Sequence, residues 1–202
     1  MFRALVLCLS ATIALVSAGK CPTKVSIQTG LDLNKYSGAW YSAARFKGAA
    51  FENGQCEKVF YKVTDASKGS LEVLNTQYNA ELDTIDYVKG TAACASGTCA
   101  ITFRPGNVGS LSVIETDYKT YSVVYACTEI AGKPDPVWFA SVLTRSKDPA
   151  QLDAYKSYGI GLLKRRVPGF PVDQMISTNQ DNKCFYLKEK PSRDIFGGAK
   201  FE

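Results

Sequence analysis

YSGAWYSAARF, the segment from Tyr36 to Phe46, is the part of the sequence from which a fold can first be inferred. Gly38 favours a turn, Trp40 follows it, and the next residues alternate as in an extended strand. A Trp side chain has a broad apolar body and one N–H group, so it needs a pocket with a single polar partner. Arg145 is the one basic residue that ends another strongly β-like run, VWFASVL, and a guanidinium can stack on an indole. We therefore expect Trp40 and Arg145 to meet and to close one end of a barrel.

Short β-like runs separated by turn residues follow this segment. With the run opened by Trp40 they predict eight strands, and the seven later ones are Cys56–Thr64, Ser70–Tyr78, Thr84–Ala93, Cys99–Arg104, Gly109–Thr116, Tyr121–Ile130 and Pro136–Thr144. The breaks between them contain Gly, Pro, Asn and Asp, which favour tight turns. Eight antiparallel strands with short connections predict an all-β, up-and-down β-barrel, since closure removes exposed sheet edges. A β-sandwich is the structural alternative.

A single α-helix is expected after the last strand. Asp148 can cap its first turn and Pro149 suits the first helical position. We expect the helix to extend to about Arg165, with a rough apolar stripe of Leu152, Tyr155, Ile160 and Leu163. The basic run Lys164-Arg165-Arg166 then complements the negative end of the helix dipole, and contact with an anionic surface is the alternative interpretation.

Three segments carry a resemblance to a known family. Residues 36–41, 115–127 and 143–146 (YSGAWY, ETDYKTYSVVYAC and LTRS) resemble, in order, the three signature blocks of the lipocalins. The resemblance covers Gly19 to Leu187. Within the family, the chain is most similar to the branch that contains apolipoprotein D, the insect bilin-binding proteins and the crustacyanins. It implies an eight-stranded antiparallel barrel with one C-terminal helix packed on its outside, and it counts against the sandwich.

The first 18 residues, MFRALVLCLSATIALVSA, have the pattern of a secretory signal peptide. Arg3 precedes an apolar run, and Val16-Ser17-Ala18 is a small-residue cleavage pattern, so we expect cleavage after Ala18 and secretion to the extracellular space. A membrane span is the weaker interpretation because the run is short and interrupted. We expect one lipocalin domain over residues 19–187 and a charged, loosely ordered tail over 188–202. The net charge of +5 is spread along the chain, which favours solubility over nucleic-acid binding.

Six cysteines remain after the expected cleavage. Export favours disulfides, and a metal site is not expected because the chain has no His and no pair of C-x2-C motifs. The sequence alone leaves the pairing open. The resemblance implies Cys21–Cys127 and Cys56–Cys184, and the short spacing around a hairpin-like tip adds Cys94–Cys99.

The inner wall of the barrel follows from strand alternation. If Arg145 points inward, alternate residues of its strand do so too, and the same argument on two further strands gives an inner set of Val137, Phe139, Ser141, Leu143, Val59, Tyr61, Val63, Leu71, Val73 and Asn75. Seven of these are our candidate ligand-binding residues: Val59, Tyr61, Val73, Asn75, Phe139, Ser141 and Leu143. The resemblance places Tyr61 and Asn75 at pocket-lining positions, and many relatives carry Trp at the position of Ser141. Tyr61 and Phe139 have a second interpretation as plain core residues, whereas a buried Asn75 amide needs a polar partner.

The function expected from the resemblance is a secreted carrier that transports one small hydrophobic molecule. A tetrapyrrole pigment, a carotenoid, a fatty acid and a sterol-like lipid are the ligands that it implies. Catalysis is not expected, because the chain has no His to act as a base and its six mature cysteines are assigned to disulfides. We also expect no cofactor and no metal.

The alternative is a protein-interaction lipocalin, such as a pigment-complex subunit or a protease inhibitor. An exposed Trp138 or the loop Lys47–Gln55 would then contact another chain. The sequence leaves open whether the protein forms a homo- or hetero-oligomer, and it does not identify the ligand.

Overall fold

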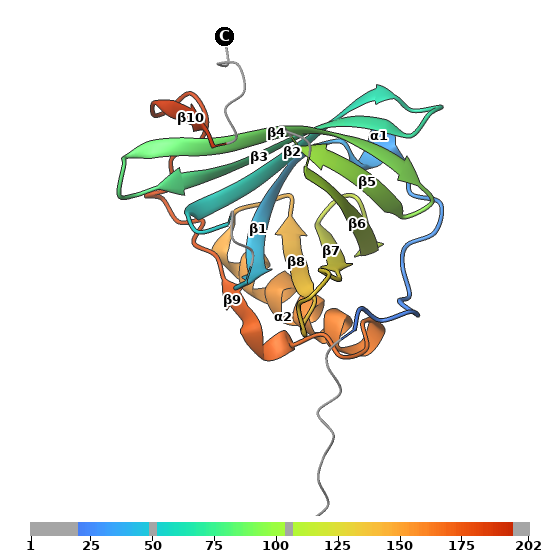
Figure 1. Ribbon diagram of the computed structural model, residues 1–202. Coiled ribbons are helices and arrows are strands. Elements are labelled where there is room, and N and C mark those ends of the chain that lie inside the picture. Colours follow the sequence, from blue (N-terminus) through green and yellow to red (C-terminus); the bar gives the residue numbers. More distant parts are fainter. Residues whose placement is uncertain (1–19, 49–51, 104–106, 196–202) are drawn as a thin grey trace, which may run out of the picture.

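Eight antiparallel strands form a closed barrel in the computed structural model, which describes residues 20–48, 52–103 and 107–195 (Figure 1). The strands are β1 (Gly38–Phe46), β2 (Gln55–Asp65), β3 (Ser70–Asn79), β4 (Thr84–Ala95), β5 (Thr98–Phe103), β6 (Asn107–Thr116), β7 (Tyr121–Thr128) and β8 (Val137–Thr144). Each pairs with the next, and β8 pairs with β1 to close the barrel. The predicted up-and-down barrel is confirmed. The expected signal peptide lies outside the described residues.

The turns are held by the short polar side chains that mark them in the sequence. Asp65 Oδ1 accepts hydrogen bonds from the backbone N–H groups of Ser67 and Lys68, at 3.0 and 3.2 Å. Asp117 Oδ1 accepts from three successive backbone N–H groups in the connection between β6 and β7. Because each side chain satisfies backbone donors that lack a strand partner, the chain can reverse without unpaired groups.

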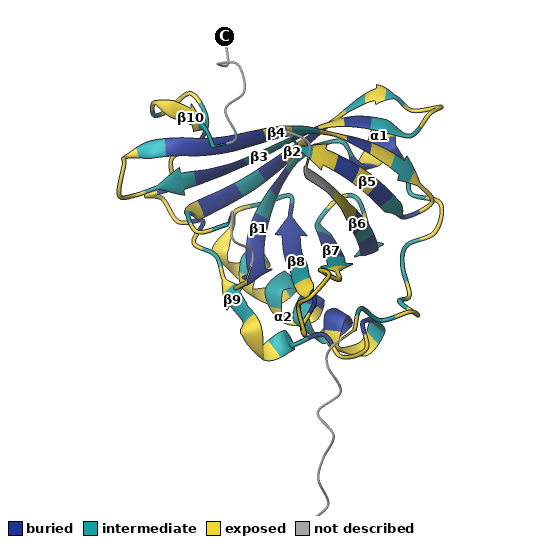
Figure 2. Ribbon diagram, viewed as in Figure 1, coloured by how far each residue is buried: buried dark blue, intermediate teal, exposed yellow. Residues whose placement is uncertain are grey.

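The helix α2 (Pro149–Arg166) packs on the outside of the barrel, against β8, β7 and β1 (Figure 1). Asp148 caps it by accepting from the N–H groups of Ala150 and Gln151, both at 3.1 Å. Its buried side is made by Gly159, Leu162 and Leu163, while the opposite side is exposed (Figure 2). The predicted external helix is therefore confirmed, and Leu163 is the one residue of the expected stripe among its buried residues.

Trp138 is half-buried against the outer apolar cluster, so it is not the fully exposed contact that the interaction hypothesis offered as one of two candidates. Its ring centroid lies 5.6 Å from that of Phe170 and 6.1 Å from that of Tyr125, within the outer apolar cluster. The alternation along β8 explains the placement, since Val142 and Ala140 face the same way and are fully buried there. Part of the loop Lys47–Gln55, the other candidate contact, lies outside the described residues.

The segment after α2 adds the 3-10 turn η1 (Val172–Gln174) and the short strands β9 (Met175–Ser177) and β10 (Ser192–Asp194). β9 pairs antiparallel with β1, and β10 pairs parallel with β4. The expectation of a loosely ordered tail from residue 188 therefore does not hold for residues 188–195. Arg193 explains the difference, because its guanidinium forms an ion pair with Asp86 of β4 at 2.8 Å. Residues 196–202 lie outside the described part.

The described residues form three disulfides, with the pairing expected from the sequence and the resemblance. Two join distant parts of the chain and the third links neighbouring strands β4 and β5 at their shared tip: Cys21–Cys127, Cys56–Cys184 and Cys94–Cys99. Persistent disulfides are typical of oxidising compartments.

Candidate ligand-binding site

One end of the barrel is closed by Trp40, which is the third residue of β1 and is fully buried. The indole Nε1 donates a hydrogen bond to the carbonyl of Tyr36 at 2.9 Å, which supplies the single polar partner expected for it. The guanidinium carbon of Arg145 lies 3.7 Å from the centroid of the Trp40 ring. The two residues therefore meet as the sequence analysis expects.

Arg145 also holds the backbone around this floor. Its guanidinium donates to the carbonyls of Ala39 at 2.9 Å, Lys35 at 2.8 Å and Tyr118 at 3.1 Å. These carbonyls belong to β1, to the short helix α1 (Leu33–Tyr36) and to the connection between β6 and β7. One side chain thus joins the adjacent segments α1 and β1 to the connection between β6 and β7, which is distant from them in sequence.

Tyr36, the last residue of α1, packs against Trp40 and forms part of the same floor. Its ring lies 5.3 Å from the rings of both Trp40 and Tyr61, and its hydroxyl forms a hydrogen bond of 2.9 Å with Ser122 Oγ. Burial raises the pKa of the Tyr36 phenol, so this hydroxyl stays neutral. The aromatic part of the floor is therefore neutral, and the guanidinium of Arg145 stacks on it.

Above the floor the barrel encloses a cavity of about 300 Å³. All seven predicted ligand-binding residues line it: Val59, Tyr61, Val73, Asn75, Phe139, Ser141 and Leu143. Register accounts for the agreement, because residues directly opposite on neighbouring strands share a face, as Val59 and Asn75 do. Strand alternation, counted from one residue that points inward, therefore predicted this part of the cavity wall.

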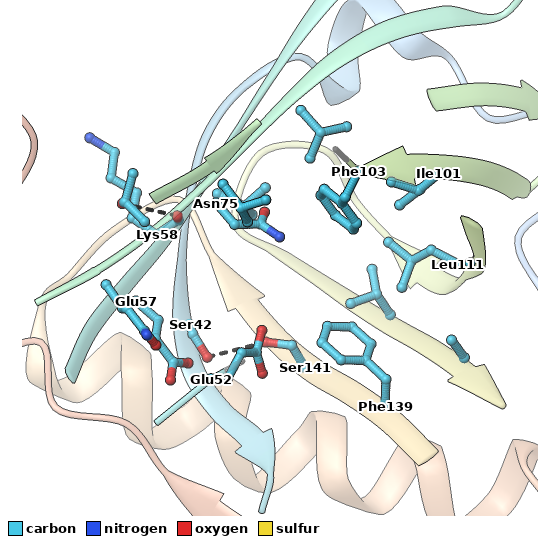
Figure 3. Close-up of a pocket in the computed structure, with 18 of the residues that line it drawn as sticks. Ser42, Glu52, Glu57, Lys58, Asn75, Ile101, Phe103, Leu111, Phe139 and Ser141 are labelled. Atoms are coloured by element: carbon cyan, nitrogen blue, oxygen red, sulfur yellow. Dashed lines mark hydrogen bonds between the residues drawn. The ribbon is translucent and has the colours of Figure 1, made fainter. Parts of the chain in front are cut away.

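Strands β5 to β7 supply an apolar side of the cavity that the sequence analysis did not name. Ile101, Phe103, Leu111 and Val124 lie there, and Figure 3 shows the first three of them facing Phe139. Alternation along these strands would have identified them, since Ile101 and Phe103 are two residues apart and so share a face.

The opposite side of the cavity is polar. Ser42 Oγ and Ser141 Oγ are 3.1 Å apart and form a hydrogen bond between β1 and β8. In Figure 3 this pair lies beside Glu52 and Glu57, at the end away from Ile101. Both glutamates line the cavity, and neither was among the predicted residues.

Glu57 forms a buried ion pair with Arg45, whose Nε lies 2.5 Å from Glu57 Oε1. A bulge in β1 brings Arg45 to the inner side: Ser42 pairs with Leu143, but Arg45 pairs with Ser141, so one extra residue separates them. Without the bulge, regular alternation from Trp40 would place Arg45 on the outer face. Burial raises the pKa of Glu57 to about 7, and the nearby Arg45 guanidinium opposes that rise only in part.

Glu52 precedes β2 and directs its carboxylate into the same polar end. Its Oε2 atom is inaccessible to solvent and has no hydrogen-bond partner among the described residues. Burial, then the charge of Glu57, raises the pKa of Glu52 well above its usual value, and Arg45 lowers it in part. No periodicity applies to a connection between strands, so no pattern in the sequence predicts that Glu52 lines the cavity.

No group of three or more His, Cys, Asp or Glu side chains is placed to hold a metal ion in the part of the chain that the structure describes. Among the helices described, none combines the length and apolar character needed to cross a membrane. The features that define the site are its apolar side, its aromatic floor and its acidic end.

A model of the lipocalin / cytosolic fatty-acid binding protein family matches residues 37–161, and the chain belongs to this family. Apolipoprotein D from Bos taurus is 33% identical over 119 residues, and that from Cavia porcellus is 31% identical over 122 residues. Both matches cover 55% of this chain, which spans 59% of the length of these relatives. Apolipoprotein D from Macaca fascicularis is 28% identical over 175 residues, covering 81% of this chain and 84% of the relative.

Solved structures show the same fold. Insecticyanin from the tobacco hornworm Manduca sexta is 22% identical and superposes with a TM-score of 0.68. The superposition covers 89% of this chain and 95% of the insecticyanin chain. Lobster apocrustacyanin A1 is 19% identical with a TM-score of 0.62, covering 82% and 96%. The resemblance found in the three signature blocks is thereby confirmed.

Proposed function

We propose that this protein is a secreted carrier that holds one small hydrophobic molecule inside the barrel, without turnover. The observation that carries the proposal is the cavity of about 300 Å³ above the plug formed by Trp40 and Arg145. Ligand pockets are typically concave, largely apolar and provided with a few placed polar groups, and this cavity has each of these properties. The three disulfides and the expected signal peptide support secretion.

Affinity in such a cavity comes from the apolar walls. Val59, Val73 and Phe139 face Ile101 and Leu111 across it, so a ligand placed there removes apolar surface from water on several sides. Polar groups fix its orientation. Tyr61, Asn75 and Ser141, which also line the cavity, supply hydroxyl and amide groups.

The size of the cavity favours a slender or planar ligand, since about 300 Å³ lies at the lower end of the usual range for ligand pockets. Fatty acids, carotenoids, tetrapyrroles and sterol-like lipids are the classes that the lipocalin resemblance implies. The description of the matching family includes fatty-acid binding proteins, which supports an elongated hydrocarbon ligand for this chain too.

A titration panel of biliverdin, a carotenoid, retinol and a fatty acid tests the carrier proposal. We expect saturable one-to-one binding of at least one of them. Ser141→Trp should fill the space beside Ser42 and weaken a bulky ligand by more than about tenfold, while a slender fatty acid loses less.

Thr102→Trp is the matched control. Thr102 is exposed on β5, so this substitution adds the same side chain away from the cavity. Absence of saturable binding for all four ligands, together with identical behaviour of Ser141→Trp and the parent, would refute the carrier.

A further inference from the structure

Four charged side chains line the cavity among the described residues, and two of them are already balanced. Asp86 receives two hydrogen bonds from Arg193 of β10, at 3.0 and 2.8 Å. Lys58 lines the cavity, but its ammonium points away from it in Figure 3 and lies 5.3 Å from the ring centroids of Tyr41 and Tyr186. Neither group therefore needs a ligand for its charge.

The other two are Glu52 and Glu57, and they share one cation. Arg45 forms its ion pair with Glu57 at 2.5 Å, with both side chains less than one tenth exposed. Glu52 Oε2 is inaccessible to solvent and unpartnered within the described part of the chain. Since a solvent-inaccessible carboxylate oxygen is costly without a donor or an opposite charge, this end of the cavity lacks one positively charged or hydrogen-bond-donating group among the described residues.

The cavity is the open space that Glu52 lines. Figure 3 shows Glu52 beside Ser42 and Ser141, at the polar end of a cavity whose far end is formed by Ile101 and Phe103. A ligand lying along the cavity would therefore present one end to the carboxylate and its apolar body to the other walls.

We propose that the occupant is an amphipathic amine, whose protonated nitrogen meets Glu52 while its hydrocarbon body fills the apolar side. This inference rests on the carrier function proposed above and gives its ligand a chemical class. An ammonium group supplies both a charge and hydrogen-bond donors to a carboxylate. A fatty acid entering with its carboxylate first would instead meet two acidic side chains and one guanidinium, and its ionised carboxylate would offer no donor to Glu52.

Three probes of equal chain length test the class: dodecylamine, dodecanol and dodecanoate, each titrated below its aggregation threshold near neutral pH. We expect dodecylamine to bind at least about tenfold more tightly than dodecanoate, with dodecanol between them. Glu52→Gln should weaken dodecylamine by about tenfold, leave dodecanol nearly unchanged and improve dodecanoate, because it removes the charge and keeps the shape.

Glu72→Gln is the matched control, since Glu72 is exposed and pairs with Lys62 on the outer face of the barrel. It makes the same change in net charge without touching the cavity, so it should leave all three affinities as they are. An equal loss of dodecylamine binding in Glu72→Gln would attribute the preference to net charge and overturn the assignment to Glu52.

A second measurement needs no variant. The affinity of the parent protein for dodecylamine should fall as the pH is lowered from neutrality, because the acidic pair takes up protons, whereas that for dodecanol should stay level. The charged and titratable groups near this end are Arg45 of β1, Glu57 and Tyr61 of β2, and Glu52 itself. A level dodecylamine affinity would contradict the proposal.

The probes also separate this inference from the carrier proposal. Saturable binding of dodecanol with no preference for dodecylamine would keep the carrier and overturn the amine assignment. Failure of all three probes to bind would overturn the amine assignment, and the titration panel above would then decide the carrier independently.

Discussion

Arg145 and Trp40 are in direct contact, with the guanidinium carbon 3.7 Å from the centroid of the indole ring. The pair joins the last residues of the barrel to its first strand, and Arg145 also donates to carbonyls of α1 and of the connection between β6 and β7. The contact is therefore both a stack and a hydrogen-bonded brace across the floor.

Arg145→Ala should lower the free energy of unfolding by roughly 2–4 kcal/mol, because it removes the cation–π contact and leaves several carbonyls without their donor. Ligand selectivity should not change, since the floor carries no ligand-discriminating group. Chemical denaturation measures the first effect and the titration panel measures the second. Arg165→Ala, at an exposed position of α2, is the control, and equal stability of the two variants would show that the floor contact is unimportant.

Two glycines of α2 should respond in opposite directions to Ala. A Cβ at Gly159 would lie 2.6 Å from Val142 Cγ2 and 2.7 Å from Val142 Cγ1, so the helix would have to move off the barrel at a cost of roughly 1–3 kcal/mol. A Cβ at Gly161 meets only the flexible end of Arg165, at 3.2 Å, and should stabilise the helix by up to about 1 kcal/mol. Thermal melts of both variants check this, and stabilisation by Gly159→Ala would contradict the packing of α2.

The acidic end of the cavity should make stability depend on pH. Burial raises the pKa of Glu57 from its usual 4.5 to about 7, so the folded state keeps a proton that the unfolded state has already released in this window. The free energy of unfolding should therefore fall as the pH rises from about 4.5 to about 7, by an amount on the order of 1–3 kcal/mol.

Denaturant titrations from about pH 5 to about pH 7.5 measure this slope and avoid the acid range in which the aspartates with lowered pKa values, such as Asp65 and Asp83, take up protons. Glu57→Gln should reduce the dependence, and Glu52, whose pKa is also raised, should account for what remains. A stability that rises with pH across the window would mean that the Arg45 ion pair dominates over burial.

The disulfides should differ in their contribution to stability because they close loops of different length. Cys56 and Cys184 are 128 residues apart, whereas Cys94 and Cys99 are five residues apart. In the chain-entropy model, replacing the first pair by Ser should cost about 5 kcal/mol and replacing the second about 2 kcal/mol. Non-reducing peptide mapping of the parent checks the pairing itself, and a link between Cys94 and any cysteine other than Cys99 would contradict it.

Most of the barrel could be predicted from the sequence because strand alternation has a fixed period. One inward residue per strand is enough to place its neighbours, which is why Val59, Asn75 and Leu143 were found. Glu57 has the same parity as Val59 and could have been found in this way, but a charged residue is not expected inside a barrel unless its partner is known.

Arg45, the ion-pair partner of Glu57, could not be predicted to point inward because a β-bulge has no clear sequence signal. It turns Arg45 inward and supplies the cation that makes an internal Glu57 tolerable. Glu52 lies outside any strand, and the pairing of β10 with β4 depends on the long-range contact between Arg193 and Asp86. Tertiary contacts of this kind cannot be derived from local pattern.

The change of partner along β1 has a consequence for motion. From Gly38 to Tyr41 this strand pairs with β2, but from Ala44 to Phe46 it pairs with β9. At the junction Gln180 Nε2 donates to the carbonyls of both Ser42 and Glu57, which substitutes a side chain for a backbone ladder. We therefore expect the amides at this junction of β1, β2 and the C-terminal segment to be protected by the docking of that segment. Their hydrogen exchange should report its local release. Amides of β3 and β4 should instead exchange through opening of the whole barrel.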